Sequence, residues 1–172
     1  MSPEDIRMMR ANEPKIRDRD LADKLNISEA ELVAAFCGED VTRIDALPDT
    51  VMGAAQQLVE VMALTRNEAC VHEKIGRYEN YHTGEHAAMV LTHDIDLRMF
   101  PKHWCHAFMM DREGRRSLQV FDAAGDAVHK VHLKEASDLS AWDRLKAELG
   151  LEDQRPVLAL EARKPVEAAN LN

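Results

Sequence analysis

Apolar residues near the N-terminus recur at intervals of three or four, a spacing that is typical of amphipathic helices. The residues that follow this spacing are Leu21, Leu25, Ile27, Leu32 and Phe36. Residues 26–28 interrupt it, and Ser28 with Glu31 forms a capping box, in which hydroxyl and carboxylate can each accept a free amide hydrogen of the first turn. Residues 1–36 are therefore predicted to be helical, with a helix, a turn and a second helix at their end.

From about residue 60 to residue 134 the pattern changes to short apolar runs that are separated by turn residues. The runs are VEVMALT, ACVHEKIGRY, HAAMVL, IDLRMF, HWCHAFMM, SLQVFD and AVHKVHL. Such runs predict a meander of β-strands, with one hairpin turn at Gly125 and another in DREGRR. Helices are predicted on either side of the meander, over residues 49–59 behind Pro48 and over residues 138–149 before Gly150.

The length of 172 residues suits one compact domain. We therefore expect a single domain over residues 1–172, of the α+β class. It is expected to be mainly helical over residues 1–60, a sheet over residues 60–134 and a helix over residues 138–149. Residues 163–172 are interpreted as a tail or linker.

The net charge of −9 disfavours a general attraction to nucleic acid or to anionic lipid. No stretch approaches the ~18 apolar residues of a membrane span, and the N-terminus MSPEDIRMMR carries acids where a signal peptide needs basic and apolar residues. We therefore expect a cytoplasmic protein without membrane insertion. The three cysteines, an odd number without a CxxC pair, support neither a disulfide framework nor a cysteine-rich zinc site.

The segment LADKLNISEAELVAAF resembles the helix-turn-helix core of many repressors. Its second helix would begin with SEAEL, whose two carboxylates lie at the end that should enter the major groove, where they would repel phosphate groups. We favour a helical pair that packs on the sheet, and no nucleic-acid partner. A helix-turn-helix transcriptional regulator is kept as an alternative.

All eight histidines lie between residues 72 and 132, in the part with predicted strands. Residues 66–134 are also formally neutral, so a ligand with negative groups would prefer this half of the chain. His82 and His86 would chelate a metal if their segment were helical, but Gly84 favours a loop.

His72 lies in a predicted strand, where a neutral imidazole could ligate iron if its other nitrogen had a partner. The alternative is a surface-facing histidine without a ligand. His129 and His132 are three positions apart on another predicted strand and should point to opposite faces, so they form no ready-made chelate.

Arg98 and Phe100 share one face of the predicted strand IDLRMF. A guanidinium binds a carboxylate in a bidentate manner and an aromatic ring offers a stacking surface, so this pair suits a flat anionic ligand. The alternative is a solvated face at a sheet edge, which Pro101 would mark.

Four segments in this order resemble the HemS/ChuS family of cytoplasmic haem-utilisation proteins, also called hemin-degrading factors, and specifically the first of their two tandem halves. The segments are RDRDLADKLNISEAELVAA, TRNEACVHEKIGRYENYHTGEHAAMVL, DIDLRMFPKHW and SLQVFDAAGDAVHKV. The resemblance implies a twisted antiparallel sheet with N-terminal helices and a closing C-terminal helix. It also implies haem, iron protoporphyrin IX, as ligand, with His72 on the iron, Arg98 across the pocket and Phe100 beside the porphyrin.

The same resemblance implies either a haem carrier or a protein that supports reductant-dependent haem degradation, and it leaves the choice open. A haem importer or a haem oxygenase would be its partner. In two-half members a principal haem histidine lies at the start of the second half, beyond this chain. Haem would then be bound by His72 alone, by another histidine or between subunits of a homodimer, as in the single-domain ChuX/HutX relatives. A docking domain that binds no haem is a further alternative.

Overall fold

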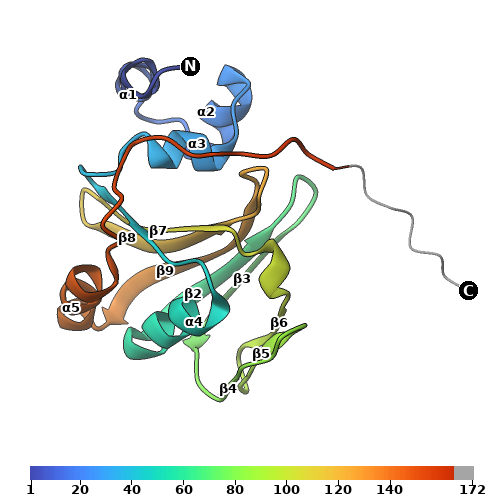
Figure 1. Cartoon of the computed structure of the whole chain (residues 1–172). Helices are drawn as coiled ribbons and strands as arrows, with labels where there is room; N and C mark the ends of the chain where they lie inside the picture. The colour runs from blue at the N-terminus through green and yellow to red at the C-terminus, as the bar shows by residue number, and fades with distance from the viewer. Residues whose placement is uncertain (165–172) are drawn as a thin grey trace, which may run out of the picture.

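The computed structural model describes residues 1–164, with helices on both sides of a large sheet (Figure 1). Its helices are α1 (Pro3–Asn12), α2 (Asp18–Leu25), α3 (Glu29–Ala34), α4 (Pro48–Gln57) and α5 (Leu139–Leu149). Its strands are β1 (Val41–Ile44), β2 (Val59–Arg66), β3 (Val71–Arg77), β4 (Tyr81–His82), β5 (Ala88–Leu91), β6 (Asp96–Met99), β7 (His106–Arg112), β8 (Arg115–Phe121) and β9 (Ala127–Ser137).

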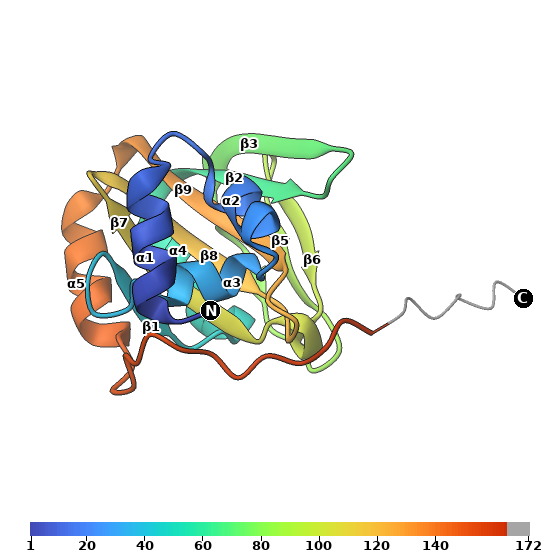
Figure 2. The same cartoon turned by 90° about the horizontal axis from the view of Figure 1, so that it is seen from above.

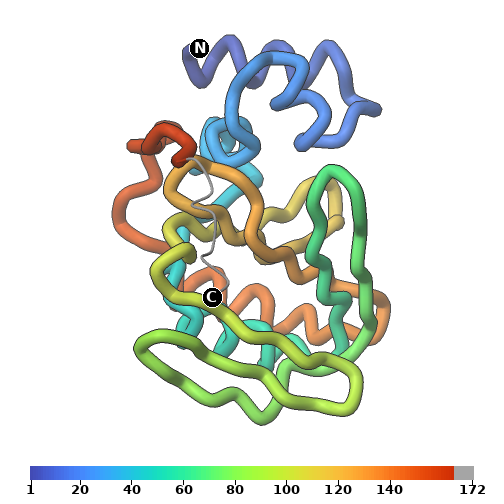
Figure 3. Tube along the Cα trace, turned by 90° about the vertical axis from the view of Figure 1, so that its right-hand side faces the viewer, coloured from blue at the N-terminus to red at the C-terminus, as the bar shows by residue number. Residues whose placement is uncertain are grey.

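Antiparallel pairing organises these strands into two sheets. The large sheet has six strands in the order β1-β7-β8-β9-β2-β3, and the small sheet has three in the order β4-β5-β6. Figure 3 shows the small sheet at the end of the molecule opposite α1. The α+β class, the antiparallel meander, the N-terminal helices and the closing helix are therefore confirmed.

Each face of the large sheet has its own apolar cover. Val61, Val120 and Val131 project to the face that packs with α4, α5 and the inner side of the small sheet, and we call this face A. Phe108 and Phe121 project to the opposite face, face B, and pack against α3. Side chains alternate between the two faces along each strand, so every strand residue can be assigned to one face from the register.

Partly buried ion pairs attach α1 and α2 to the large sheet. Arg112 of β7 donates to both carboxylate oxygens of Asp18, at 2.7 and 2.8 Å, and Arg10 of α1 donates to the same carboxylate at 2.7 Å. Burial raises the pKa of Asp40, while the neighbouring Arg112 opposes this shift. Because each charged group has an oppositely charged partner, the network offsets part of the cost of removing these groups from water. It fixes α1 and α2 beside the end of β7 on face B (Figure 2).

The structure differs from the sequence prediction in its shortest elements. The strands β1 and β4, of four and two residues, are absent from the predicted set. The run HWCHAFMM yields a strand only from His106, because residues 101–103 form a 3₁₀ turn behind Phe100. The predicted tail begins at residue 163, and its residues 165–172 lie outside the described part of the chain.

The turn between β8 and β9 packs directly on the start of α3. Gly125 has φ +87°, and a Cβ at this position would lie 2.3 Å from Oγ of Ser28. Its carbonyl oxygen also accepts a hydrogen bond from the amide of Ala30 at 3.1 Å. Ser28 in turn accepts from the amide of Glu31 at 3.1 Å, which confirms the hydroxyl half of the capping box.

We expect Gly125→Ala to lower the free energy of unfolding by about 1–3 kcal/mol, since the new methyl group adds both backbone strain and a clash with Ser28. Urea denaturation monitored by circular dichroism measures this change. Gly53→Ala is the control, because Gly53 lies within α4 with open space around it and should be neutral or gain up to about 1 kcal/mol. An unchanged midpoint for Gly125→Ala would contradict the packing described.

Candidate functional site

A row of side chains runs across face A from the exposed edge of the large sheet into its core. Thr65 of β2 lies directly opposite His72 of β3, and Val120 of β8 lies opposite His129 of β9. Oγ1 of Thr65 and Nδ1 of His129 are 2.9 Å apart, which joins the two pairs. The row therefore leads from the exposed His72 through Thr65 to His129, which is 5% exposed.

Three side chains contact the ring of His129. The hydroxyl of Tyr78 lies 2.6 Å from Nε2, Thr65 is bonded to Nδ1, and the ring of Trp104 stacks at 6.4 Å between centroids with an interplanar angle of 28°. Burial, reinforced by His132 and His72, lowers the pKa of His129 to about 4. His129 is therefore neutral near pH 7, with a partner for each ring nitrogen.

The role of His129 was missed by the sequence analysis, which predicted only that it and His132 face opposite sides. That prediction is correct, because His129 shares face A with Val131 whereas His132 pairs with Met62 and Ser117 on face B. A signal was present in the run AVHKVHL, where His129 is the polar member of an otherwise apolar alternation.

His72 lies on the face of β3 that is turned toward the small sheet. Lys74 and Gly76 share this face, Nζ of Lys74 lies 3.5 Å from a carboxylate oxygen of Asp94, and a Cβ on Gly76 would lie 2.8 Å from Cβ of Asp94. The connection between β5 and β6 therefore covers β3 at Lys74 and Gly76. The imidazole of His72 is exposed and has no hydrogen-bond partner within residues 1–164.

Arg98 and Phe100 lie at the other sheet. Met99 and Ile95 point into the core, so Arg98 faces away from it, where it binds Asp96 at 2.6 Å. The ring of Phe100 is 53% exposed.

The register of the small sheet sets Met89 opposite both Arg98 and His82. The structure thus groups Arg98 with His82 in one row, whereas His72 belongs to the large sheet. His82 is exposed at the end of β4, and His86 lies in a bend, so the HTGEH segment forms no helix. Within residues 1–164 no three histidine, cysteine, aspartate or glutamate side chains gather as a metal site would require.

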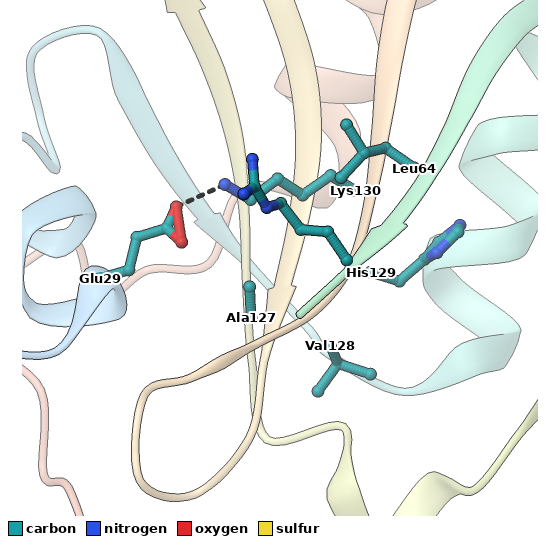
Figure 4. A pocket seen from close by; sticks show the side chains of 7 residues that line it. Glu29, Leu64, Ala127, Val128, His129 and Lys130 are labelled. Atoms are coloured by element: carbon teal, nitrogen blue, oxygen red, sulfur yellow. Dashed lines mark hydrogen bonds and ion pairs between the residues drawn. The ribbon is translucent and has the colours of Figure 1, made fainter. Parts of the chain in front are cut away.

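Two cavities of the structure are lined by none of His72, Arg98 and Phe100. The smaller, of about 10 Å³, is lined by Glu29, Leu64, Arg66, Ala127, Val128, His129 and Lys130. Figure 4 shows Lys130 reaching to Glu29 on one side of β9 while His129 points to the other side. The larger cavity, of about 230 Å³, is polar and lies between α2 and the β8–β9 turn.

An exposed imidazole without a partner, an arginine and an exposed aromatic ring suit the iron, a carboxylate and the apolar ring of haem respectively. These donors fit the group chemically. All three are exposed, and none of them lines either of the two cavities described above.

The helix-turn-helix alternative is wrong for a physical reason. The second helix of that motif is α3, which has six residues, and its apolar residues Ala30, Leu32 and Val33 are buried. Its first residue, Glu29, is 7% exposed and forms an ion pair with Lys130. A recognition helix needs a free face to enter the major groove, and α3 has none.

None of the described helices is long and apolar enough to cross a membrane.

The fold occurs in a known family. Residues 26–149 match the haemin-degrading HemS.ChuX domain, and the chain belongs to this family. It is 40% identical over 164 residues to the hemin transport protein HmuS of Yersinia pestis. The matched region covers 92% of this chain and 47% of that protein. The chain spans about half the length of the curated relatives it matches.

Solved structures agree with this assignment. Holo-PhuS, a heme-binding protein from Pseudomonas aeruginosa, superposes with a TM-score of 0.91 at 40% identity, over 99% of this chain and 52% of that one. The heme degrading enzyme ChuS of Escherichia coli O157:H7 superposes with a TM-score of 0.81 at 32% identity, over 93% and 49% of the two chains.

Burial of neutral His129 predicts a loss of stability in mild acid. Its pKa is about 4 in the folded protein against 6.5 for a free side chain. The contribution is complete above the unfolded value and is lost as the pH falls toward the folded value, because the unfolded chain binds the proton first. By about pH 5 the loss is about 2 kcal/mol.

Urea denaturation of wild type and His129→Gln at about pH 7.5 and about pH 5 measures this loss. Burial lowers the pKa of His132 to about 4 as well, but His132 is present in both proteins, so the difference between their losses isolates His129. Equal losses in the two proteins would contradict the burial of a neutral ring.

Proposed function

We propose that this protein binds haem in haem uptake and utilisation, and either carries it or supports its degradation to release iron. The observation that carries the proposal is the match of nearly the whole chain to holo-PhuS, a heme-binding protein, at 40% identity. Membership of the HemS/ChuX family and the similarity to hemin transport proteins and to the heme degrading enzyme ChuS support it.

In this proposal His72 would bind the haem iron as its axial ligand, Arg98 would neutralise a propionate or contact the distal side, and Phe100 would cover part of the macrocycle. The exposed imidazole of His72 supports the first role, since ligation needs a free nitrogen and an approach for the iron. Bound haem supplies the redox-active iron that degradation with a reductant would require. The chain's own residues bind and orient the group, and the Asp96 carboxylate holds Arg98 until a propionate replaces it.

We also propose a cytoplasmic homodimer that exchanges haem with a haem importer or a haem oxygenase. Two features support a second copy as cover. The candidate residues lie on an open surface, and on the other face of the edge strand β3 the apolar side chains of Val71 and Ile75 are 46% and 51% exposed. A macrocycle that is covered on one side only would retain a large apolar area in water.

Titration of the protein with hemin tests the proposed function. We expect a saturable Soret band with about one haem per chain or per dimer. Light scattering on the same samples gives the mass that decides between these two ratios. Non-saturable absorbance would refute haem binding, and a monomer mass with and without hemin would refute the dimer.

Substitution of His72 and Arg98 should have different effects. His72→Ala removes the iron bond, so the Soret maximum and the spin state should change. Arg98→Ala should leave the iron–imidazole bond in place and weaken binding by on the order of ten- to a hundredfold, the equivalent of about 1–3 kcal/mol for a charge-assisted contact.

His82→Ala, His86→Ala and His132→Ala are the matched comparisons, and His82 is the most informative because it shares a row with Arg98. An unchanged spectrum in His72→Ala together with a changed one in any of these three would transfer the ligand role to that histidine.

A further inference from the structure

The hydroxyl group of Thr65 occupies a position between a buried histidine and an exposed one. Thr65 lies opposite His72 in the β2–β3 ladder, and directly opposite residues have Cβ atoms about 4.5–5.5 Å apart. On its other side it is bonded to Nδ1 of His129. Thr65 itself is exposed, so its hydroxyl is available to groups that bind at this edge of the sheet.

The direction of these hydrogen bonds follows from Tyr78. Its side chain is fully buried, and Nε2 of His129 is its hydrogen-bond partner among residues 1–164. If the phenol oxygen only accepted, its own hydrogen would be buried without an acceptor, which costs about 1–3 kcal/mol. Tyr78 therefore donates to Nε2 of His129.

The remaining proton of His129 then determines the state of Thr65. A neutral imidazole carries one N–H, which must lie on Nδ1 because Nε2 accepts. His129 accordingly donates to Oγ1 of Thr65. A hydroxyl oxygen has two lone pairs, so Thr65 keeps one for a further donor, and its own hydrogen points to solvent.

A ligating histidine needs an acceptor of this kind. When one ring nitrogen binds iron, the other carries a proton, and a fixed acceptor for that proton sets the ring orientation and increases the basicity of the ligand. His72 has no such partner within residues 1–164, and the carboxylate beside its face, Asp94, is bound to Lys74. The hydroxyl of Thr65 is the group that the β-sheet register sets opposite it.

We propose that Thr65 is a positioning residue, fixed by His129 and Tyr78, which accepts the N–H hydrogen of His72 when His72 binds haem iron. This inference rests on the proposed function. The acceptor is held by the core of the protein, since Tyr78 and His129 are both buried. The two hydrogen bonds that join Tyr78, His129 and Thr65 thus fix the acceptor for a ligand on an exposed edge of the sheet.

The first part of the test uses the protein without haem. Nitrogen-15 NMR of the His129 ring should show the Nδ1–H tautomer in wild type and a mixture or the other tautomer in Tyr78→Phe, where Nε2 has lost its donor. The Nε2–H tautomer in wild type would overturn the proposal.

The second part uses the haem complex. Resonance Raman spectra of the ferrous form report the iron–imidazole stretch, which should move to lower frequency in Thr65→Val, with an affinity loss of about ten- to a hundredfold. Thr65→Ser keeps the hydroxyl and should restore both. Thr42→Val, on β1 at the far edge of the same sheet, is the matched control and should resemble wild type.

The outcomes separate this inference from the proposed function. If wild type binds haem through His72 while Thr65→Val keeps the wild-type frequency, the role of Thr65 is refuted and the function stands. If Thr65→Ser fails to restore the frequency, Thr65 acts through packing and the inference is refuted. If wild type shows no haem binding that depends on His72, both fail. Circular dichroism confirms that each variant is folded.

Discussion

The pairing of β2 with β3 on one side and with β9 on the other is the constraint on which the arrangement of the site depends. One register sets Thr65 opposite His72, and the neighbouring ladder brings β9 alongside, so that Thr65 also reaches His129. A slip of one residue in either ladder would move a histidine to the other face of the sheet. The continuous apolar content of face A opposes such a slip, because Val61, Ala63 and Val131 would leave the core with it.

The N-terminal helices serve this arrangement indirectly. Face B is covered by α3 near β7 and β8, and the Arg10–Asp18–Arg112 network holds α1 and α2 in place beside it. Removing one partner of a buried charged pair costs more than the pair itself contributes, so the network acts against any departure of these helices. The helical segment that resembles a DNA-binding motif is therefore structural.

Sequence alone predicted the elements whose patterns are local. The alternation in VEVMALT and in IDLRMF predicted the strands and the common face of Arg98 and Phe100, and Ser28 predicted the start of α3. Strand β1 escaped prediction because its four residues pair with β7, more than sixty positions later in the sequence. The partners of His129 escaped for the same reason, since Tyr78 is 51 positions away and Thr65 is 64 positions away. Periodicity shows that two residues share a face of one strand, but only the register between strands shows which residues of different strands meet.

The candidate ligand and its support differ in exposure, and this difference suits a protein that must both take up and release haem. An enclosed ligand would bind tightly but exchange slowly, because the surrounding chain must open before the iron can leave. An exposed ligand exchanges readily but loses rotamer freedom when it binds, and that lost entropy weakens affinity. In the proposed arrangement, the buried side chains of Tyr78 and His129 fix an acceptor beside the exposed His72. This reduces the entropy that His72 loses on binding without the slow exchange of an enclosed ligand. In the proposed haem complex, rigidity would be supplied from the core side of the sheet, and a second copy or a partner would cover the open side of the macrocycle.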